Sequence, residues 1–354
     1  MDSSDLLDLL GDSRAAALLG LLTGLVFGIA AQRSAFCLRA ATVEFARGRL
    51  GPRVTVWLLC FSTALAWVQL ASLAGLFRGA DARIMSVPGS LSGAVIGGTL
   101  FGIGMVMARG CSGRLLVLAA TGNLRSLVSG LVFAVVAQMS LHGRLAPLRN
   151  WLAAQWTTGA RNIDALAWAG LPHWAGLALG LGTAGVALAL ARRNRVGLRV
   201  LVFGSGVGFA VALGWVATWQ LSQRAFDPVS VTSLTFSGPS AGTLMFFLDR
   251  QGVPSFDIGL VPGVFLGAFA AAALAGELEF QGFAGESQMR RSMAGAALMG
   301  FGAMLAGGCA IGNGVTGASV FALTSLVALC AMWAGAVATD LLLDHGAEPA
   351  AGVA

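Results

Sequence analysis

The sequence lacks lysine and tyrosine altogether, and only 11% of its 354 residues are charged. A soluble domain carries about 25% charged residues. Here 56% of the residues are hydrophobic and the mean hydropathy is +0.80. The scarcity of charge excludes an ordinary soluble protein and predicts an all-α polytopic membrane protein, in which each helix needs about 20 apolar residues to cross the lipid.

Sequence signatures of several kinds of chemistry are also missing. There is no Walker A motif, so the chain has no means of hydrolysing ATP by itself. Three histidines, near the ends of apolar runs, are too few for a haem site or a proton relay. The five cysteines form no C-x-x-C pair, which argues against a zinc knuckle or a disulfide framework. We therefore expect no enzymatic activity, no catalytic residues, no cofactor and no bound metal.

All 22 basic residues are arginines, and they flank the apolar runs. This placement indicates membrane topology and attraction of anions, and we expect no nucleic-acid partner. The first residues are acidic and have no positive region like that of a cleaved signal peptide. We expect a multi-pass protein of the bacterial inner membrane, with a periplasmic N-terminus and a cytoplasmic C-terminus.

Nine apolar runs are long enough to cross a bilayer. They are Ala15–Gln32, Val54–Phe77, Leu91–Ala108, Leu124–Leu141, Trp174–Ala191, Leu198–Leu221, Ile258–Gly276, Met293–Gly307 and Val320–Leu342. Four further segments are rich in small residues but too short to cross. These are Arg33–Phe45, Cys111–Ala120, Ser233–Leu248 and Cys309–Ser319. Their many uncharged residues favour re-entrant helices over surface loops, because irregular backbone is tolerated at membrane depth where it lines an enclosed path.

An internal repeat organises the chain. The run from Gly102 to Cys111 (GIGMVMARGC) resembles the run from Gly300 to Cys309 (GFGAMLAGGC), at an offset of 198 residues. We expect one transporter domain over 1–354, with pseudo-repeat halves at about 15–141 and 198–342 and a spacer helix at about 174–191. An odd spacer inverts the second half, and inverted repeats place a substrate site near the membrane midplane.

Cys37, Cys111 and Cys309 each lie where a long apolar run meets a broken segment. A free cysteine is ordinarily a small buried hydrophobe, and we interpret Cys60 and Cys330 in that way. The recurrence of the other three favours a function. They can form a redox relay, bind a soft metal, or donate weak S–H hydrogen bonds to a polarizable anion. The last interpretation fits a sulfur-bearing anion best.

Glycine-rich flanks favour an anion as well, because they expose backbone N–H groups and helix N-termini. They can equally serve close helix packing. Arg109 precedes one cysteine and is a candidate to attract the anion at one mouth, whereas Arg114 is interpreted as an anchor at the membrane edge. The other candidates for the substrate path are Ser34, Ser112, Gly113, Asn123, Ser237, Gly238, Gly312, Asn313 and Gly314.

Three motifs resemble the YeeE/YedE family of sulfur-transport membrane proteins over essentially the whole chain. They are the run Gln32-Arg-Ser-Ala-Phe-Cys37, the Gly102 repeat continued through Gly113 to Asn123, and the Gly300 repeat continued through Gly314. The resemblance implies nine crossings and four short helices dipping toward the centre. It also implies that Cys37, Cys111 and Cys309 line a central path and pass thiosulfate by S–H hydrogen bonds.

The sequence thus predicts a permease that imports thiosulfate or a related small anion. The resemblance further implies a TusA-like cytoplasmic sulfur-carrier protein as a partner, and some family members are linked to selenium compounds. Two other functions stay open. One is a membrane thiol redox protein, and the other is a docking subunit for the sulfur carrier that conducts nothing.

Overall fold

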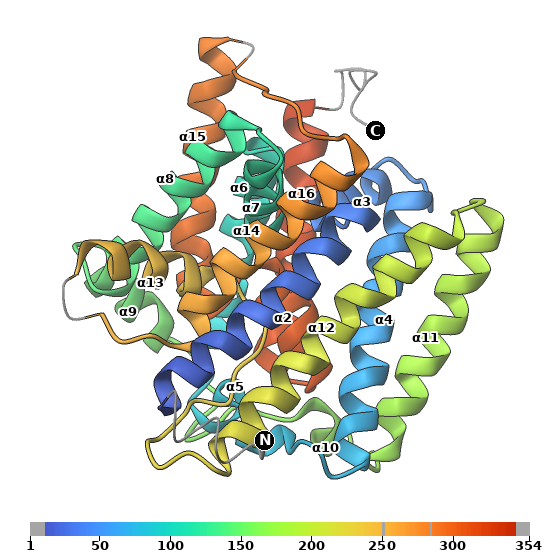
Figure 1. Cartoon of the computed structure of the whole chain (residues 1–354), viewed down its shortest axis with the longest axis vertical. Coiled ribbons are helices and arrows are strands. Elements are labelled where there is room, and N and C mark those ends of the chain that lie inside the picture. The colour runs from blue at the N-terminus through green and yellow to red at the C-terminus, as the bar shows by residue number, and fades with distance from the viewer. Residues whose placement is uncertain (1–10, 250–251, 284, 345–354) are drawn as a thin grey trace.

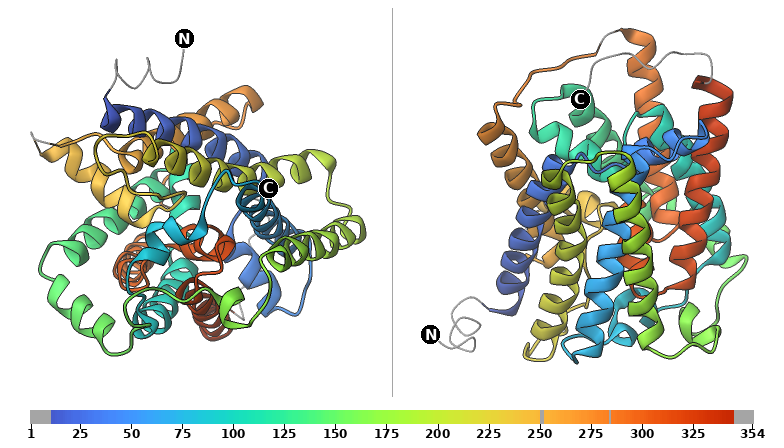
Figure 2. Two further views of the ribbon diagram at one scale, coloured as in Figure 1. Left: turned by 90° about the horizontal axis from the view of Figure 1, so that it is seen from below. Right: turned by 90° about the vertical axis from the view of Figure 1, so that its right-hand side faces the viewer.

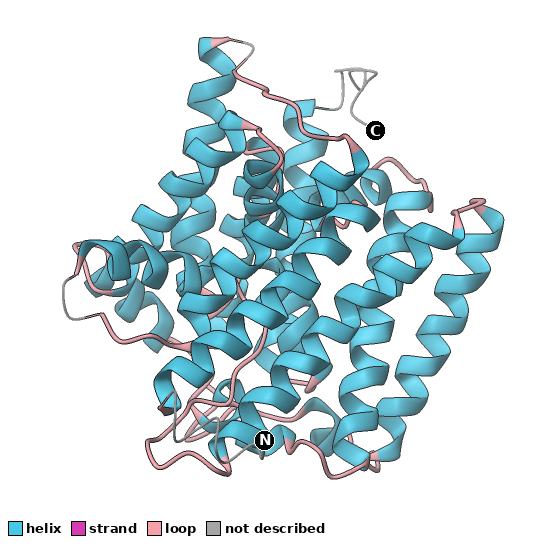
Figure 3. Ribbon diagram, in the orientation of Figure 1, coloured by secondary structure: helices cyan, strands magenta, loops and turns pink. Residues whose placement is uncertain are grey.

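The computed structural model describes residues 11–249, 252–283 and 285–344. The acidic residues 1–10 and His345, which entered the sequence argument, lie outside these ranges. Every named element within them is a helix (Figure 3). The expected all-α architecture is therefore confirmed.

Nine long helices make up most of the chain within the described ranges (Figure 1). They are α2 (Asp12–Ser34), α4 (Pro52–Leu73), α6 (Leu91–Met107), α8 (Leu124–Leu141), α11 (Trp174–Arg193), α12 (Leu198–Ser222), α14 (Phe256–Ala275), α15 (Glu286–Leu305) and α16 (Leu323–Thr339). Each matches one of the nine expected runs. The chain is a polytopic membrane protein.

Eight helices in the described ranges are long and apolar enough to cross a membrane, and α15 is not among them. This helix begins at Glu286 and carries Arg290 and Arg291, whereas the apolar run begins only at Met293. Hydropathy cannot detect the polar first turns of a helix, so the sequence placed its start too late. A ninth crossing by α15 stays a prediction.

Short helices occupy the four segments expected to be broken. They are α3 (Leu38–Ala46), α7 (Ser112–Ala120), α13 (Ser237–Leu248) and the helical residues 310–319, of which Gly312–Gly317 form a π-helix. Each is followed by a long helix. The four segments are therefore helical, and their placement within the membrane stays a prediction.

Smaller helices connect the long ones. They are η1 (Gly79–Asp81), α5 (Arg83–Ser86), α9 (Ala146–Ala154) and α10 (Ala165–Trp168), and η3 (Asp340–Asp344) follows α16. Figure 1 shows α5 and α10 at one end of the bundle and α9 on a flank. The tryptophans of the connecting segment are exposed, Trp151 by 63% and Trp168 by 75%. This is the arrangement expected of side chains in the headgroup layer.

The helix pairings are the same in both parts of the chain. Helix α2 packs on α14, and α12 packs on α4 in the same way. Helix α6 packs on α16, as α15 packs on α8. Figure 2 shows α2, α12 and α14 side by side along one flank. This exchange of partners agrees with a two-fold repeat, and the inversion of the second half stays a prediction. Helix α11 packs on α4.

Helices α2 and α14 approach closely because both carry glycines four residues apart. On α2 these are Gly20, Gly24 and Gly28, and on α14 they are Gly259, Gly263 and Gly267. A Cβ atom at Gly24 would lie 2.4 Å from the carbonyl oxygen of Leu260. Small residues at this spacing let membrane helices pack backbone against backbone. The pair thereby fixes the long helices around the short ones.

Candidate functional site

Cys37, Cys111 and Cys309 each stand at the N-terminus of a short helix. Their carbonyl oxygens accept the first helical hydrogen bond, from Ala41 at 3.2 Å, Leu115 at 2.9 Å and Asn313 at 2.8 Å respectively. Residues with this bonding are N-caps, so the side chain lies beside the free N–H groups of the first turn. The sequence folds in this way because a residue with positive φ ends the preceding long helix just before each cysteine: Ala35, Arg109 and Gly307.

A backbone N–H three residues further along interacts with each cysteine sulfur. The N–H of Gly312 lies 3.5 Å from the Cys309 sulfur. The N–H groups of Ala40 and Arg114 act in the same way on Cys37 and Cys111. The three sulfurs thus lie at the positive ends of helix dipoles, which are the natural binding sites for anions.

The three cysteines come together in space. The thiols of Cys37 and Cys111 are side-chain hydrogen-bond partners, and Cys309 is near enough to act on Cys111 electrostatically. Cys111 and Cys309 are buried and Cys37 is partly buried. We call these residues the cysteine cluster. Cys60 and Cys330 lie within α4 and α16 instead, the first buried and the second exposed.

The N-terminus of α13 joins the cluster at Cys309. The backbone N–H of Phe236 donates to the Cys309 sulfur over 3.3 Å, and the hydroxyl of Thr235 lies 3.9 Å from the same atom. The Ser237 hydroxyl lies 3.3 Å from that of Thr235. Two N–H groups and one hydroxyl therefore surround Cys309, from the segment that begins α13 and from its own helix. The sequence predicted Ser237 as a path residue but not Thr235, because Thr235 has no neighbouring glycine in the chain.

An apolar contact joins the residues next to Cys111 with those next to Cys309. A Cβ atom at Gly113 would lie 2.5 Å from Cδ1 of Ile311 and 3.3 Å from the ring of Phe236. Phe236 also packs on Phe27 of α2, with ring centroids 5.3 Å apart. Gly113, Ile311 and Phe236, which we call the constriction, therefore join the first turns of α7, α13 and residues 310–319.

A cavity of about 340 Å³ reaches the cluster from one side. Its wall includes Thr235, Ser237 and Gly312 around Cys309, and Arg83 and Arg149 lie further out. Gly238, another expected path residue, lines it too. The Nε atom of Arg149, the indole N–H of Trp215 and one oxygen of Asp257 are buried there without a hydrogen-bond partner among the described residues. We call this space the Arg83 cavity.

Two arginines lie near the other side of the cluster. Arg39 and Arg114 both act electrostatically on Cys37, and Arg114 acts on Cys111 as well. One terminal nitrogen of Arg114 is buried without a partner in the described part of the chain. The interpretation of Arg114 as an anchor at the membrane edge is therefore wrong, because the short helix α7 turns its first residues inward.

A second pocket, of about 330 Å³, lies at the opposite end of α6. It is lined by Met107, Arg109, Arg125, Ser287, Gln288, Arg291 and Ser292, and we call it the Arg125 pocket. Ser90, the N-cap of α6, lines the Arg83 cavity, whereas Met107 ends the helix at this pocket. The 17 residues of α6 span about 25 Å, so the two spaces lie near opposite faces of the bundle. Arg109, expected at a mouth, is exposed here with φ +58°.

The two asparagines expected on the path have local partners. Asn123 caps α8 by accepting from the Ser126 N–H at 2.9 Å, and its amide donates to Gln281 at 2.8 Å. It lies at the far end of α7, away from Cys111. The Asn313 amide donates to the carbonyls of Ala306 and Gly308, at 3.2 and 2.8 Å. Asn313 therefore holds the turn before Cys309 in place.

The remaining expected residues lie close to the cluster. Ser34 donates to the Ala30 carbonyl at 2.7 Å within α2. The Ser112 hydroxyl, beside Cys111, is buried with no partner among the described residues. Gly314 lies buried in the π-helical segment, where a Cβ atom would come within 3.0 Å of Leu329. No three His, Cys, Asp or Glu side chains gather into a possible metal site in the described ranges.

Comparison with known proteins places this arrangement among membrane transport proteins. Residues 33–338 match the family described as Sulphur transport. The chain is 25% identical over 311 residues to the thiosulfate transporter TsuA of Escherichia coli (strain K12), covering 84% of this chain and 86% of that protein. It is 27% identical over 329 residues to the thiosulfate transporter TsuA of Spirochaeta thermophila, covering 87% and 93%.

Proposed function

Because the chain belongs to the Sulphur transport (YeeE/YedE) family, we propose that it imports a small sulfur-containing anion, thiosulfate first of all, across the bacterial inner membrane. The observation that carries this proposal is the meeting of three thiols at helix N-termini, between an arginine-lined cavity and an arginine-lined pocket. In this proposal the chain is a permease and catalyses no reaction.

The first step is capture in the Arg83 cavity, which faces the periplasm. Arg83 and Arg149 supply two positive charges against the single carboxylate of Asp257. The anion then moves to Cys309, where the N–H groups of Phe236 and Gly312 already point at the sulfur. An oxygen or sulfur atom of the ligand can take the place of the cysteine sulfur as the acceptor of these N–H groups.

The second step passes the constriction. Ile311 closes the space beside Gly113 with the end of a flexible side chain, so a rotamer change is enough to open it. Beyond it the anion meets Cys111 and Cys37, whose helix N-termini and neighbouring Arg114 favour negative charge. Inverted halves supply such stations from both sides of the centre.

Thiols suit this path because they bind weakly. An S–H group is a poor hydrogen-bond donor, and its sulfur is polarizable like the terminal sulfur of thiosulfate. Conduction requires several sites that each hold the ion loosely enough to release it. A selenium-containing analogue of similar charge would satisfy the same groups. A TusA-like carrier protein would take up the anion at the cytoplasmic face.

Uptake of radiolabelled thiosulfate tests the proposal, in a host without thiosulfate uptake of its own and in proteoliposomes without any partner protein. Cys309→Ala and Cys111→Ala should lower the rate by about tenfold or more, which corresponds to roughly 1.4 kcal/mol of lost stabilisation. Cys330→Ala is the matched control, because Cys330 is exposed on α16. Wild-type rates in both cluster variants would contradict the path, and flux without a partner would exclude a mere docking subunit.

A second candidate function is a membrane thiol redox protein. The hydrogen bond between the Cys37 and Cys111 thiols favours it, because two paired thiols can oxidise to a disulfide. Thiol labelling before and after oxidation separates the two proposals. A redox protein loses both labels reversibly during turnover, whereas a permease keeps both thiols labelled while it transports.

A further inference from the structure

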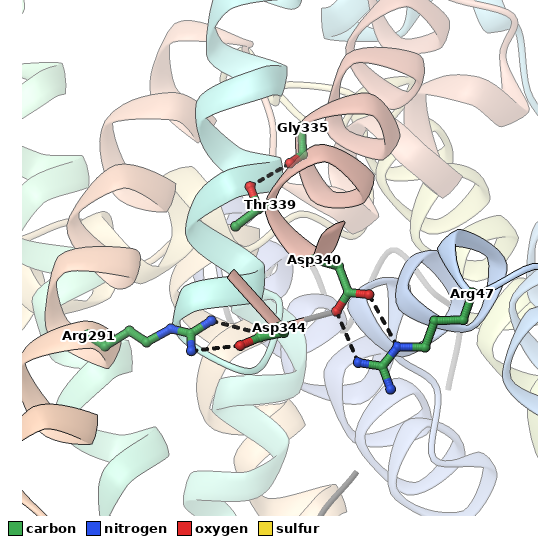
Figure 4. A network of polar contacts seen from close by, with 6 residues as sticks. All are labelled: Arg47, Arg291, Gly335, Thr339, Asp340 and Asp344. Carbon is green, nitrogen blue, oxygen red and sulfur yellow. Dashed lines mark hydrogen bonds and ion pairs between the residues drawn. The ribbon is translucent and has the colours of Figure 1, made fainter. Parts of the chain in front are cut away.

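Two arginines hold the acidic end of α16. Arg291 donates to both oxygens of Asp344, at 2.9 and 2.8 Å, and Arg47 donates to both oxygens of Asp340, at 3.3 and 3.4 Å (Figure 4). The Asp340 side chain is fully buried, and that of Asp344 is 15% exposed. The end of the described chain is thus tied to two separate elements by two-pronged ion pairs.

Arg291 is also part of the wall of the Arg125 pocket. Three arginines line this pocket, and no carboxylate is among its lining residues. The Nε atoms of Arg125 and Arg291 are buried and have no hydrogen-bond partner among the described residues. A pocket with this wall presents unused donors and a surplus of positive charge over the Asp344 carboxylate that pairs with Arg291, which together suit an anion.

The positive charge extends from this pocket toward the cysteine cluster. Arg39 and Arg109 both act electrostatically on Asp344, and Arg39 acts on Cys37 as well. Arg125 in turn interacts with Arg39 and Arg109. With Arg47 and Arg291, four arginines therefore act on the carboxylates of Asp340 and Asp344, and Arg125 lies beside two of them. An anion that leaves Cys37 on this side enters a region of surplus positive charge.

We propose that the Arg125 pocket binds a divalent oxyanion, and that the Asp344 carboxylate competes with this anion for Arg291. A carboxylate presents two oxygens to one guanidinium, and a sulfate-like head presents two oxygens in the same way. The identity of the anion as thiosulfate rests on the proposed function. The preference for a small, doubly charged oxyanion rests on the arginines alone.

Competition by Asp344 keeps the pocket from retaining its ligand. An anion held by several unopposed arginines would leave slowly, and transport needs a last station that releases. The carboxylate re-forms its two hydrogen bonds with Arg291 as the anion departs, so the partly buried guanidinium is not left unpaired. Competition by Asp344 also lowers the fraction of Arg125 pockets that hold an anion when the anion concentration is low.

Arginine modification by phenylglyoxal tests the site in the purified full-length protein. Peptide mass spectrometry reads the modification rate of each arginine over a series of thiosulfate concentrations, at constant ionic strength with sodium gluconate. Arg125 is the reporter, and Arg290 is the internal control because it is exposed and pairs only with Glu286 among the described ion pairs. Sodium sulfate is the second probe, because it has the charge of thiosulfate without the terminal sulfur.

Both anions should slow modification of Arg125 and leave Arg290 unchanged. In Asp344→Asn the midpoint concentration should fall by about tenfold, since the competing charge is gone. Unprotected Arg125 in the wild-type protein overturns the site, and this series needs no variant to fold. Equal midpoints in wild type and Asp344→Asn overturn the competition. Protection is measured without flux, so a protein that fails to transport can still bind, and the two failures are distinguishable.

Discussion

The backbone N–H of Phe236 donates a 3.3 Å hydrogen bond to the sulfur of Cys309, although 73 residues separate them in the chain. The bond aims the N-terminus of α13 at the same atom that caps residues 310–319. A single sulfur thus accepts from two helix N-termini. A ligand that replaces this sulfur as the acceptor meets N–H groups that are already oriented, so no backbone rearrangement is needed.

Replacing Cys309 with serine tests separately its role as a helix N-cap and its proposed role in transport. Serine is a strong N-cap, so Cys309→Ser should keep the helix and the melting temperature of the purified protein. The hydroxyl oxygen is smaller and less polarizable than sulfur, and thiosulfate uptake should fall by about tenfold. Uptake assays and thermal unfolding in detergent measure the two effects. Cys330→Ser is the control, and wild-type uptake in Cys309→Ser would refute a requirement for sulfur at this position.

The contact between Gly113 and Ile311 in the constriction predicts the effects of two substitutions. Gly113→Ala places a methyl group against Ile311, whose flexible end must move, and against the Phe236 ring. We expect a folded protein with reduced thiosulfate uptake, because the added group obstructs the space between Cys309 and Cys111. Ile311→Ala in the same chain should restore uptake in part, since it removes the contacted methyl group. A double variant no faster than Gly113→Ala alone would argue against obstruction at this contact.

Periodicity and length predicted the long helices well. Helix α8 has the expected bounds, Leu124–Leu141, because an asparagine cap begins it and apolar residues fill it. The repeat placed Cys111 and Cys309 at equivalent positions, and both cap short helices as its two similar copies suggest. The polar start of α15 was not predicted, because Glu286, Arg290 and Arg291 lie on a helical surface that hydropathy cannot distinguish from a loop.

The side chains around the site were harder to predict than the helices. Arg114 looks like an anchor in the sequence because its surroundings are known only after α7 turns inward. Thr235 and Arg149 are not themselves part of a repeat or glycine motif, and they reach the Arg83 cavity through tertiary folding. The pairing of Cys37 with Cys111 likewise joins residues 74 positions apart, which no local pattern encodes.

Arg114→Gln should lower thiosulfate uptake without lowering stability. One guanidinium nitrogen of Arg114 is buried with no partner among the described residues. Its lost hydration therefore lowers the free energy of unfolding. Its removal relieves that penalty, and we expect an unchanged or higher melting temperature. Its charge acts on Cys37 and Cys111, so anion binding between them should weaken. Arg49→Gln, at an exposed position, is the control. A parallel loss of stability and uptake would indicate a structural role instead.

The glycines between α2 and α14 make the last prediction, which concerns folding. A Cβ atom at Gly263 would lie 2.2 Å from the backbone carbonyl oxygen of Leu21, an atom that cannot move without shifting the whole helix. Gly263→Ala should therefore separate the two helices and lower the melting temperature by several degrees, with a loss of about 1–3 kcal/mol for overpacking.

The matched control is Gly182→Ala on α11, where a Cβ atom meets nothing within 4 Å. Alanine is the better helix former by about 1 kcal/mol, so this variant should be as stable as wild type or more stable. Thermal unfolding in detergent compares the two substitutions directly. Equal melting temperatures would mean that α2 and α14 tolerate a wider spacing, and the close approach would then not be what positions the short helices.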